Sequence, residues 1–160
     1  THTYPRFEYT HFGYSNQVQR FDKTSGKIVL DRAAKTGSVD VAIDAKSVNT
    51  GYALFNQHIQ AEDYFHTEKF PSISFKSTAV KFDGDKPVAI EGNLTIKGVS
   101  KPVTLTVTSF HAMPHPMLKK DAIGANASTT VKRSEFNMGK HVPYVSDEVK
   151  ITIAVEAIKE

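Results

Sequence analysis

The stretch that most constrains the fold is 88–109, in which two alternating segments flank a turn-forming sequence. In the first segment Ile90 and Leu94 alternate with polar side chains, and in the second Val103 alternates with threonines. Such alternation predicts strands with one apolar and one polar face, because successive side chains of a strand point to opposite sides. Two such strands joined by a turn at 97–102 form a hairpin whose apolar face must be covered.

The same alternation recurs along most of the chain and predicts about eight antiparallel strands. A break at Thr24-Ser25-Gly26 makes the second of them either one long bent strand or two short ones. The expected strands lie at 4–13, 17–31, 37–47, 72–82, 88–96, 103–109, 122–132 and 149–157.

The only convincing helix candidate is 53–65, and the stretch 111–121, rich in His, Met, Pro and Lys, is expected to be a loop. Eight strands fit a closed barrel or a two-sheet sandwich, and closure is favoured because it removes exposed strand edges. We therefore expect an all-β, eight-stranded antiparallel barrel, with one short helix in a strand connection, as a single domain over residues 1–160.

Small side chains are frequent at the positions expected to point inward. A solid core would use more Leu and Phe, so a barrel lined in this way is expected either to shrink or to leave a cavity that an apolar ligand can fill. The small inward residues are Ala45, Ser77, Ala79, Gly92, Ser109, Ala125 and Ala127.

Composition excludes several classes of function. The absence of cysteine excludes disulfides, thiol catalysis and zinc fingers. The net charge of +3 comes from scattered basic residues, so we expect no nucleic acid binding. No run approaches the ~18 apolar residues of a membrane-spanning helix. The start at Thr1, without methionine, fits a processed secreted protein or a trimmed chain.

A set of motifs spans nearly the whole chain. They are His2-Thr3 with Phe7 and His11, Ser47-Val48-Asn49-Thr50, Asp63-Tyr64-Phe65, the stretches 70–77 and 92–105, and Arg133 with Phe136. These motifs resemble those of the YceI-like polyisoprenoid-binding family. The resemblance implies a lipocalin-like eight-stranded barrel that holds a long isoprenoid in an elongated tunnel. It also implies a periplasmic or secreted protein of a Gram-negative bacterium, with its signal peptide removed, and no catalytic residues.

The chain departs from the family pattern at a few positions. Phe55-Asn56 stands where relatives often show an Arg-Asp pair, Gln19 stands where Gly is frequent, and Glu135 replaces the usual Asp. The first change removes a charge from the expected mouth of the tunnel. If relatives use that charge for a phosphorylated head group, this chain is expected to prefer a neutral head such as a quinone ring.

The primary hypothesis is non-catalytic binding or carriage of a long-chain isoprenoid, either a quinone such as ubiquinone or a polyprenyl phosphate, with no catalytic cofactor. Each five-carbon unit contributes about 3 kcal/mol as an upper bound, so many units are needed to exceed the cost of association. The alternatives are a secreted interaction domain whose packed barrel presents protein-binding loops, or a fatty-acid or amide binder. Whether two barrels pair as a homodimer is left open.

Head-group contacts are expected from His58 and Arg133 near the mouth, with His11 deeper. His11 can instead be a core residue, and Arg133 can instead tie the last connection to the barrel rim through Glu135. The full set of expected lipid contacts is Phe7, Tyr9, His11, Phe21, Val41, Ile43, Phe55, His58, Ile59, Phe75, Leu94, Leu105, Ala125, Ala127, Arg133, Phe136 and Ile153.

Two other kinds of site receive less support. Imidazole and thioether groups in 111–117 suit copper, but prolines limit their convergence and a flexible loop is the competing interpretation, so no metal is expected. No nucleophile elbow or HExxH motif is present, and Ser134, His141 and Asp147 share only proximity in sequence, so we expect no enzyme. The metal candidates were His111, Met113, His115 and Met117.

Overall fold

The computed structural model describes residues 2–160, which form ten strands, one α-helix and two 3-10 helices. All ten strands lie in one antiparallel sheet, ordered β3-β4-β6-β7-β8-β9-β10-β1-β2-β5. The strands are β1 Tyr4–His11, β2 Ser15–Phe21, β3 Thr24–Asp31, β4 Thr36–Asp44, β5 Val48–Asn49, β6 Ser72–Asp83, β7 Lys86–Ile96, β8 Val99–Pro114, β9 Asp121–Lys132 and β10 Glu148–Ile158, and the helices are η1 Ala45–Ser47, α1 Ala53–His58 and η2 Arg133–Phe136.

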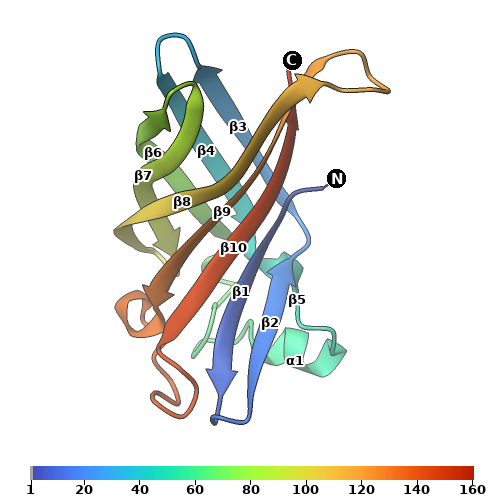
Figure 1. Cartoon of the computed structure of the whole chain (residues 1–160). Coiled ribbons are helices and arrows are strands. Elements are labelled where there is room, and N and C mark those ends of the chain that lie inside the picture. Colours follow the sequence, from blue (N-terminus) through green and yellow to red (C-terminus); the bar gives the residue numbers. More distant parts are fainter. Residues whose placement is uncertain (1) are drawn as a thin grey trace.

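The sheet curls strongly into a half-barrel, with α1 at one end (Figure 1). The all-β class, the antiparallel pairing and the short helix are confirmed, but the expected eight strands are ten. The difference arises because two long strands are interrupted, β2 from β3 at Asp22-Lys23 and β4 from β5 by η1. The hydrogen-bonded order ends at β3 and β5, so the pairing does not form the closed ring that we expected.

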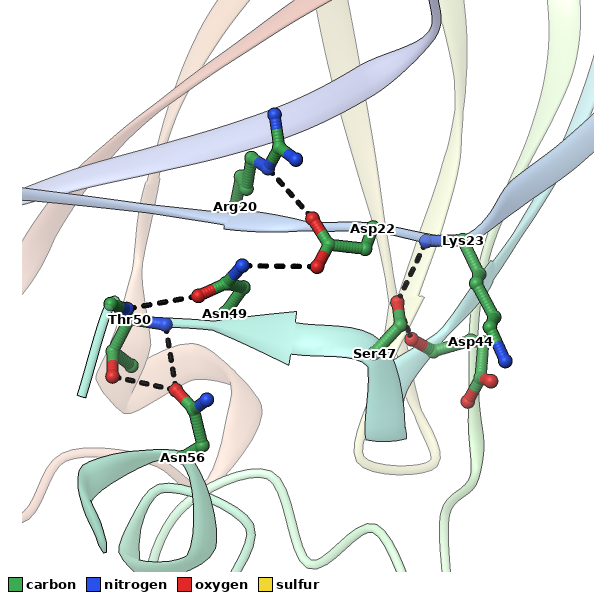
Figure 2. Close-up of polar contacts among 9 residues, drawn as sticks. Arg20, Asp22, Lys23, Asp44, Ser47, Asn49, Thr50 and Asn56 are labelled. Carbon is green, nitrogen blue, oxygen red and sulfur yellow. Dashed lines mark hydrogen bonds and ion pairs between the residues drawn. The ribbon is translucent and has the colours of Figure 1, made fainter. Parts of the chain in front are cut away.

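Both interruptions lie at the same place and form one corner of the sheet (Figure 2). The amide of Asp22 donates to the carbonyl of Ser47 at 3.1 Å, and the amide of Asp44 donates to the carbonyl of Lys23 at 3.0 Å. The amide of Lys23 also donates to the Ser47 hydroxyl at 3.0 Å. Backbone groups released from the strand ladder are thus paired across the corner, so the two interrupted strands turn together.

The break expected near Thr24-Ser25-Gly26 lies just before it, at Asp22-Lys23, so the segment forms two strands and β3 begins at Thr24. Gly26 lies within this strand, where a Cβ atom would stand 2.3 Å from the carbonyl oxygen of Asp40 on β4. Glycine here permits close approach of two strands and does not make a turn.

The helix expected over 53–65 is too long, because α1 ends at His58 and the chain continues in tight turns. Ile59 and Phe65 are both buried in the core. Six positions along a straight α-helix correspond to a rotation of about 240°, which would place these two side chains on different faces. The turns bring both inward, with the amide of Phe65 donating to the carbonyl of Ile59 at 3.1 Å.

The hairpin at the centre of the sequence analysis forms, with a tighter turn than expected. Lys97 and Gly98 both have positive φ, 52° and 75°, and Ile96 pairs with Val99. Positive φ at both central residues is typical of a type I′ turn. Ser109 does not point inward as predicted, because a register shift between Val107 and Ser109 reverses the alternation, and Ser109 is exposed.

The stretch 111–121 is only partly a loop. β8 continues to Pro114 and β9 starts at Asp121, so the hairpin protrudes from the half-barrel with only 115–120 at its tip (Figure 1). The amide of His115 donates to the carbonyl of Lys120 at 2.7 Å and closes the tip. The sequence did not indicate this strand extension, because proline is uncommon in strands.

Gly92 was expected to help keep the barrel interior open. In the structure the ring of Phe75 occupies the space that a side chain at position 92 would need. A Cβ atom on Gly92 would stand 2.5 Å from Phe75 Cζ and 2.6 Å from the carbonyl oxygen of Lys76. Gly92 therefore allows β6 and β7 to pack tightly around an aromatic ring.

We predict that Gly92→Ala lowers the free energy of unfolding by about 1–3 kcal/mol, because the added methyl group has no room. Gly124→Ala is the matched control, since its Cβ atom would meet nothing closer than the Val155 carbonyl oxygen at 3.9 Å. Urea denaturation measures both variants. Equal effects of the two substitutions would contradict the tight contact.

Candidate functional site

A cavity of about 360 Å³ lies at the end of the half-barrel near α1, which is the lower end in Figure 1. We call it the lower cavity. Its wall combines inward-facing residues of the sheet with Phe55 and His58 of α1, Tyr64 and Phe65 of the following turns, and residues between η2 and β10 such as Met138. The volume falls within the range typical of small-molecule sites.

The inner wall of the lower cavity is aromatic. The ring of Phe7 on β1 lies 5.5 Å from that of Phe21 and 5.7 Å from that of Phe65, and the rings of Phe21 and Phe65 are 5.4 Å apart. Phe21 and Phe65 are buried in the core. These contacts fix the wall in place, so the cavity is preformed and apolar on this side.

Most residues that the sequence predicted as lipid contacts line the lower cavity. They come from β1, β2, β4, α1, β7 and η2, and their role in lipid binding stays a prediction. They are Phe7, Tyr9, His11, Phe21, Ile43, Phe55, His58, Ile59, Leu94, Arg133 and Phe136.

A second hollow, which we call the upper cleft, lies between β3 with the adjoining part of β4 and the C-terminal half of β10. Two further predicted contacts, Val41 and Ile153, line it, and Ile43 lines both the upper cleft and the lower cavity.

Four predicted contacts line neither hollow. Phe75 is buried in the core, and Leu105 packs against it from β8. Ala127 is buried where it pairs with Val107 and Ile153, and Ala125 is partly buried on the same strand. The two alanines therefore do not open the tunnel that was expected at their positions.

Several lining residues were missed. Val149 and Ile151 share the β10 face of Ile153, so alternation could have identified them. Tyr64 and Phe65 belong to the motif Asp63-Tyr64-Phe65, so the family resemblance could have identified them. The lining residues between η2 and β10 carried no signal, because irregular polar segments show no periodicity. They are Met138, Lys140, His141 and Val145.

The guanidinium of Arg133 is held by backbone carbonyls of the segment before β10. Nε donates to Ser146 at 2.9 Å, Nη2 to Val145 at 2.8 Å, and Nη1 to both Lys140 at 3.1 Å and Met138. The expected tie through Glu135 is therefore wrong, because carbonyl oxygens supply the contacts. A guanidinium has five N–H donors, so these four bonds leave one for a ligand.

Burial lowers the pKa of Arg133 from its ordinary value, while the negative charge of Asp147 opposes the shift. Burial also raises the pKa of the Tyr9 hydroxyl, against a hydrogen bond from Gln19 and the positive charge of Arg133. Tyr9, Arg133 and Tyr64 thus form an interacting polar group within the wall of the lower cavity.

Gln19, the residue flagged as replacing a common glycine, is buried with only 4% of its surface exposed. Its Oε1 has no hydrogen-bond partner among the described residues. The amide hydrogen bond to Tyr9 supports the orientation of the phenol.

The mouth of the lower cavity is formed by exposed polar and aromatic residues. His58 stacks obliquely on Tyr64, with ring centres 5.1 Å apart. His11 is exposed and packs on Phe12 at 4.7 Å, so the expectation that it lies deeper than His58 is wrong, because β1 ends at His11 and a surface turn follows.

An ion pair bridges two segments beside the mouth. Lys140 Nζ lies 2.5 Å from Asp63 Oδ2, joining the turns after α1 to the segment before β10. Their hydrogen bond lowers the pKa of Asp63 and raises that of Lys140. The charge of Lys140 is thereby engaged by a carboxylate.

Residues of the candidate triad and of the His/Met stretch make other contacts in the structure. The Ser134 hydroxyl donates to Asp147 Oδ2 at 2.6 Å, whereas a triad would need it beside His141. In the 115–120 tip, His115 Nδ1 accepts amide hydrogen bonds from Met117 and Leu118 at 3.2 Å. Residues 2–160 contain no cluster of three His, Cys, Asp or Glu side chains placed to hold a metal.

Known proteins that are similar to this chain identify its family. A model of the YceI-like domain matches residues 1–157. The chain belongs to the YceI-like domain family. It is 34% identical over 160 residues to Protein YceI of Escherichia coli O157:H7, covering 99% of this chain and 83% of that protein.

Solved structures of YceI-like and related proteins share the fold. The crystal structure of Burkholderia cenocepacia BcnA superposes with a TM-score of 0.84 at 26% identity, covering 97% of this chain and 96% of that one. A polyisoprenoid binding domain from Saccharophagus degradans, implicated in plant cell wall breakdown, has a TM-score of 0.73 at 16% identity, covering 99% and 94%. No helix within residues 2–160 has the length and apolar character that crossing a bilayer requires.

We predict that Arg133→Met lowers the free energy of unfolding by about 2–4 kcal/mol, because four carbonyls, three of them in partly buried hydrogen bonds, lose a charged donor. Arg133→Lys should recover little of this stability, since an ammonium group cannot reproduce the planar array of donors of a guanidinium. Thermal and urea denaturation measure the effect, with the exposed neighbour Lys132→Met as the control. A change no larger than that of the control would contradict the carbonyl clamp.

Asp147 makes a pH-dependent contribution to the free energy of unfolding. Burial opposes ionisation, but hydrogen bonds from Ser134 and the charge of Arg133 outweigh it, so the pKa of Asp147 lies below its ordinary value. A lowered carboxyl pKa adds stability above the unfolded pKa of about 3.9, and this is lost as pH falls through the folded pKa. Asp147→Asn should cost about 1 kcal/mol at neutral pH. In denaturation curves from pH 7 to about pH 3, the difference from wild type should shrink at the acidic end; a constant difference would contradict the assignment.

Proposed function

We propose that this protein binds a long-chain isoprenoid lipid without chemical conversion, and that an isoprenoid quinone is its preferred ligand. The observation that carries the proposal is the lower cavity itself, which is apolar and aromatic inside and gathers its polar groups near the mouth. Such a site fits a molecule with a long apolar tail and a small polar head.

The interior suits an isoprenoid tail because its contacts are dispersive and not directional. Phe7, Phe21 and Phe65 offer ring faces and edges, and Ile43 and Leu94 offer branched aliphatic groups. At about 30 Å³ per carbon, roughly the volume of one water, the cavity holds about two to three five-carbon units. The tail beyond these units requires further space.

The head is proposed to be neutral because two cations that line the cavity, Arg133 and Lys140, are already engaged. Arg133 donates four hydrogen bonds to backbone carbonyls, and Lys140 is paired with Asp63. A phosphate or pyrophosphate usually requires bidentate arginine or several free donors. A quinone carbonyl can accept single hydrogen bonds from Arg133 and Tyr9.

The departure at Phe55-Asn56 agrees with this preference. Phe55 lines the cavity, whereas the Asn56 side chain accepts hydrogen bonds from the Thr50 amide at 2.7 Å and the Thr50 hydroxyl at 2.6 Å. Phe55 therefore presents an apolar ring to the ligand, and Asn56 ties α1 to Thr50, the residue that follows β5.

The Saccharophagus degradans domain, described as a polyisoprenoid binding domain, supports the same ligand class for this chain through its shared fold. We extend the proposal to a periplasmic or secreted location, on the motif resemblance alone. Fractionation of cells that express the protein with its native leader would test the location.

Organic extraction of the purified protein, followed by mass spectrometry, tests the function directly. We predict about one long-chain isoprenoid per protein chain, or a rise in melting temperature when an isoprenoid quinone is added to lipid-free protein. Empty extracts together with no rise on adding any prenyl lipid would refute the proposal.

A pair of variants localises the lipid to the lower cavity. Val131→Trp places a large ring into the lining and should reduce quinone affinity at least tenfold, about 1.4 kcal/mol. Ala125→Phe is the control, because Ala125 lines neither hollow. Loss of binding in the control but not in Val131→Trp would place the lipid elsewhere, provided that both variants keep cooperative melting.

The choice of head group is tested by competition between a quinone and a polyprenyl phosphate of equal chain length. We predict preference for the quinone, with binding that depends little on salt because no free cation pair is involved. Tighter, salt-sensitive binding of the phosphate would instead assign the head to Arg133 and Lys140 as charge partners.

A further inference from the structure

We propose that exposed aromatic and aliphatic side chains beside the mouth of the lower cavity form a surface that docks on a lipid bilayer. The docking is inferred from these side chains, and its use as the route by which the lipid enters the cavity rests on the proposed function. We call this surface the mouth patch, and its members are Phe12, Tyr14, Tyr52, Leu54, Val142 and Tyr144.

The mouth patch comes from three segments that also line the lower cavity. They are the turn between β1 and β2, the start of α1 and the segment before β10, and all three lie at the lower end of the half-barrel (Figure 1). In the turn His11 lines the cavity, while Tyr14 is 89% exposed. At the start of α1 Phe55 lines the cavity, while Leu54 is 62% exposed. The mouth patch therefore borders the opening of the cavity.

Two of the three segments form one continuous surface. The ring of Phe12 stacks on that of Tyr144, with ring centres 6.0 Å apart and planes inclined by 17°. The amide of Phe12 also donates to the carbonyl of Tyr144 at 2.7 Å, and His11 pairs with Val145 in an antiparallel bridge. The turn and the segment before β10 are thus held together, so their exposed side chains act as a unit.

Backbone amides of this surface are paired within the protein. Besides the amide of Phe12, that of Tyr14 donates to the carbonyl of His11 at 2.9 Å, and that of Val142 donates to the carbonyl of Gly139 at 3.2 Å. An amide that enters lipid without a partner is costly, because the hydrocarbon offers no acceptor. These amides can therefore approach the bilayer without losing their hydrogen bonds.

The composition of the mouth patch favours a bilayer as its partner. Three of its six members are tyrosines, whose rings are apolar while their hydroxyl groups stay hydrated, and such side chains concentrate at membrane–water interfaces. Beside the mouth the charge of Lys140 is matched by that of Asp63, so we expect docking to depend on apolar burial. A bilayer is also where a long isoprenoid resides, because its tail is excluded from water.

A smaller exposed apolar group provides an internal comparison. Met113, Met117 and Leu118 lie on the β8–β9 hairpin, which protrudes from the end of the half-barrel away from α1 (Figure 1). Since this group is remote from the lower cavity, docking through it would not bring the mouth to the membrane. The two groups therefore predict different orientations of the protein on a bilayer.

The first test uses an introduced tryptophan, because the chain contains none. In lipid-free Tyr14→Trp protein, phosphatidylcholine vesicles should shift the emission to shorter wavelength, and brominated acyl chains should quench it. Met117→Trp is the matched control, since Met117 is 84% exposed on the hairpin, and should show neither change. Neutral vesicles are used because a protein of net charge +3 is attracted to any anionic surface.

The second test separates docking from binding inside the cavity. Tyr14→Ser combined with Leu54→Ser should lower vesicle affinity in co-sedimentation at least tenfold, about 1.4 kcal/mol, and slow quinone transfer from vesicles by a similar factor. Its affinity for a water-soluble short-chain quinone should stay within about twofold of wild type, because neither residue lines the cavity. Met117→Ser combined with Leu118→Ser should leave all three quantities unchanged.

The outcomes distinguish the docking surface from the proposed function. If lipid-free wild-type protein does not bind the vesicles, or if Met117→Trp responds as strongly as Tyr14→Trp, docking by the mouth patch is refuted. Binding of the short-chain quinone would then leave the proposed function standing. If the vesicles bind through the mouth patch but the protein takes up no prenyl lipid, the proposed function fails and the docking surface stands.

Discussion

The corner where β2 passes into β3 and β4 passes into β5 is the constraint on which the rest of the structure depends. At this corner Asp22, Lys23 and Ser47 pair across the bend, with the Lys23 amide donating to the Ser47 hydroxyl (Figure 2). From this corner a chain of polar contacts continues to α1, since Asn49 donates to Asp22 at 3.0 Å and Asn56 accepts from Thr50. The bend thus places α1 over the end of the sheet, where the lower cavity forms.

The same site shows how an apolar cavity can contain an arginine. Arg133 satisfies four of its donors with carbonyls of the segment before β10, so the charge organises that segment as a wall and does not demand a carboxylate from a ligand. The side chain of Lys140 is engaged in a similar way by Asp63 beside the mouth. The site therefore combines a rigid rim with few free charges, a combination that favours dispersion over ion pairing as the source of affinity.

The sequence predicted the strands well because alternation has a period of two wherever one face is dry, as in β7 with Ile90 and Leu94. It failed where alternation is interrupted: the bulge before Ser109 reversed a face, and prolines hid the end of β8. It identified much of the lower cavity through inward aromatics and family motifs. It could not show that Ala125 and Ala127 line neither hollow, or that carbonyls hold Arg133, because both depend on how segments distant in sequence come together.

The central claim is that an isoprenoid lies inside the lower cavity with its tail directed away from the mouth. Intermolecular nuclear Overhauser effects between an unlabelled long-chain quinone and methyl-labelled protein measure this most directly. The account predicts contacts from the lipid to the methyl groups of Val131, Val149 and Ile151, which line the cavity. Contacts confined to exposed methyl groups such as those of Val29 and Leu118, with none to the lining residues, would contradict it.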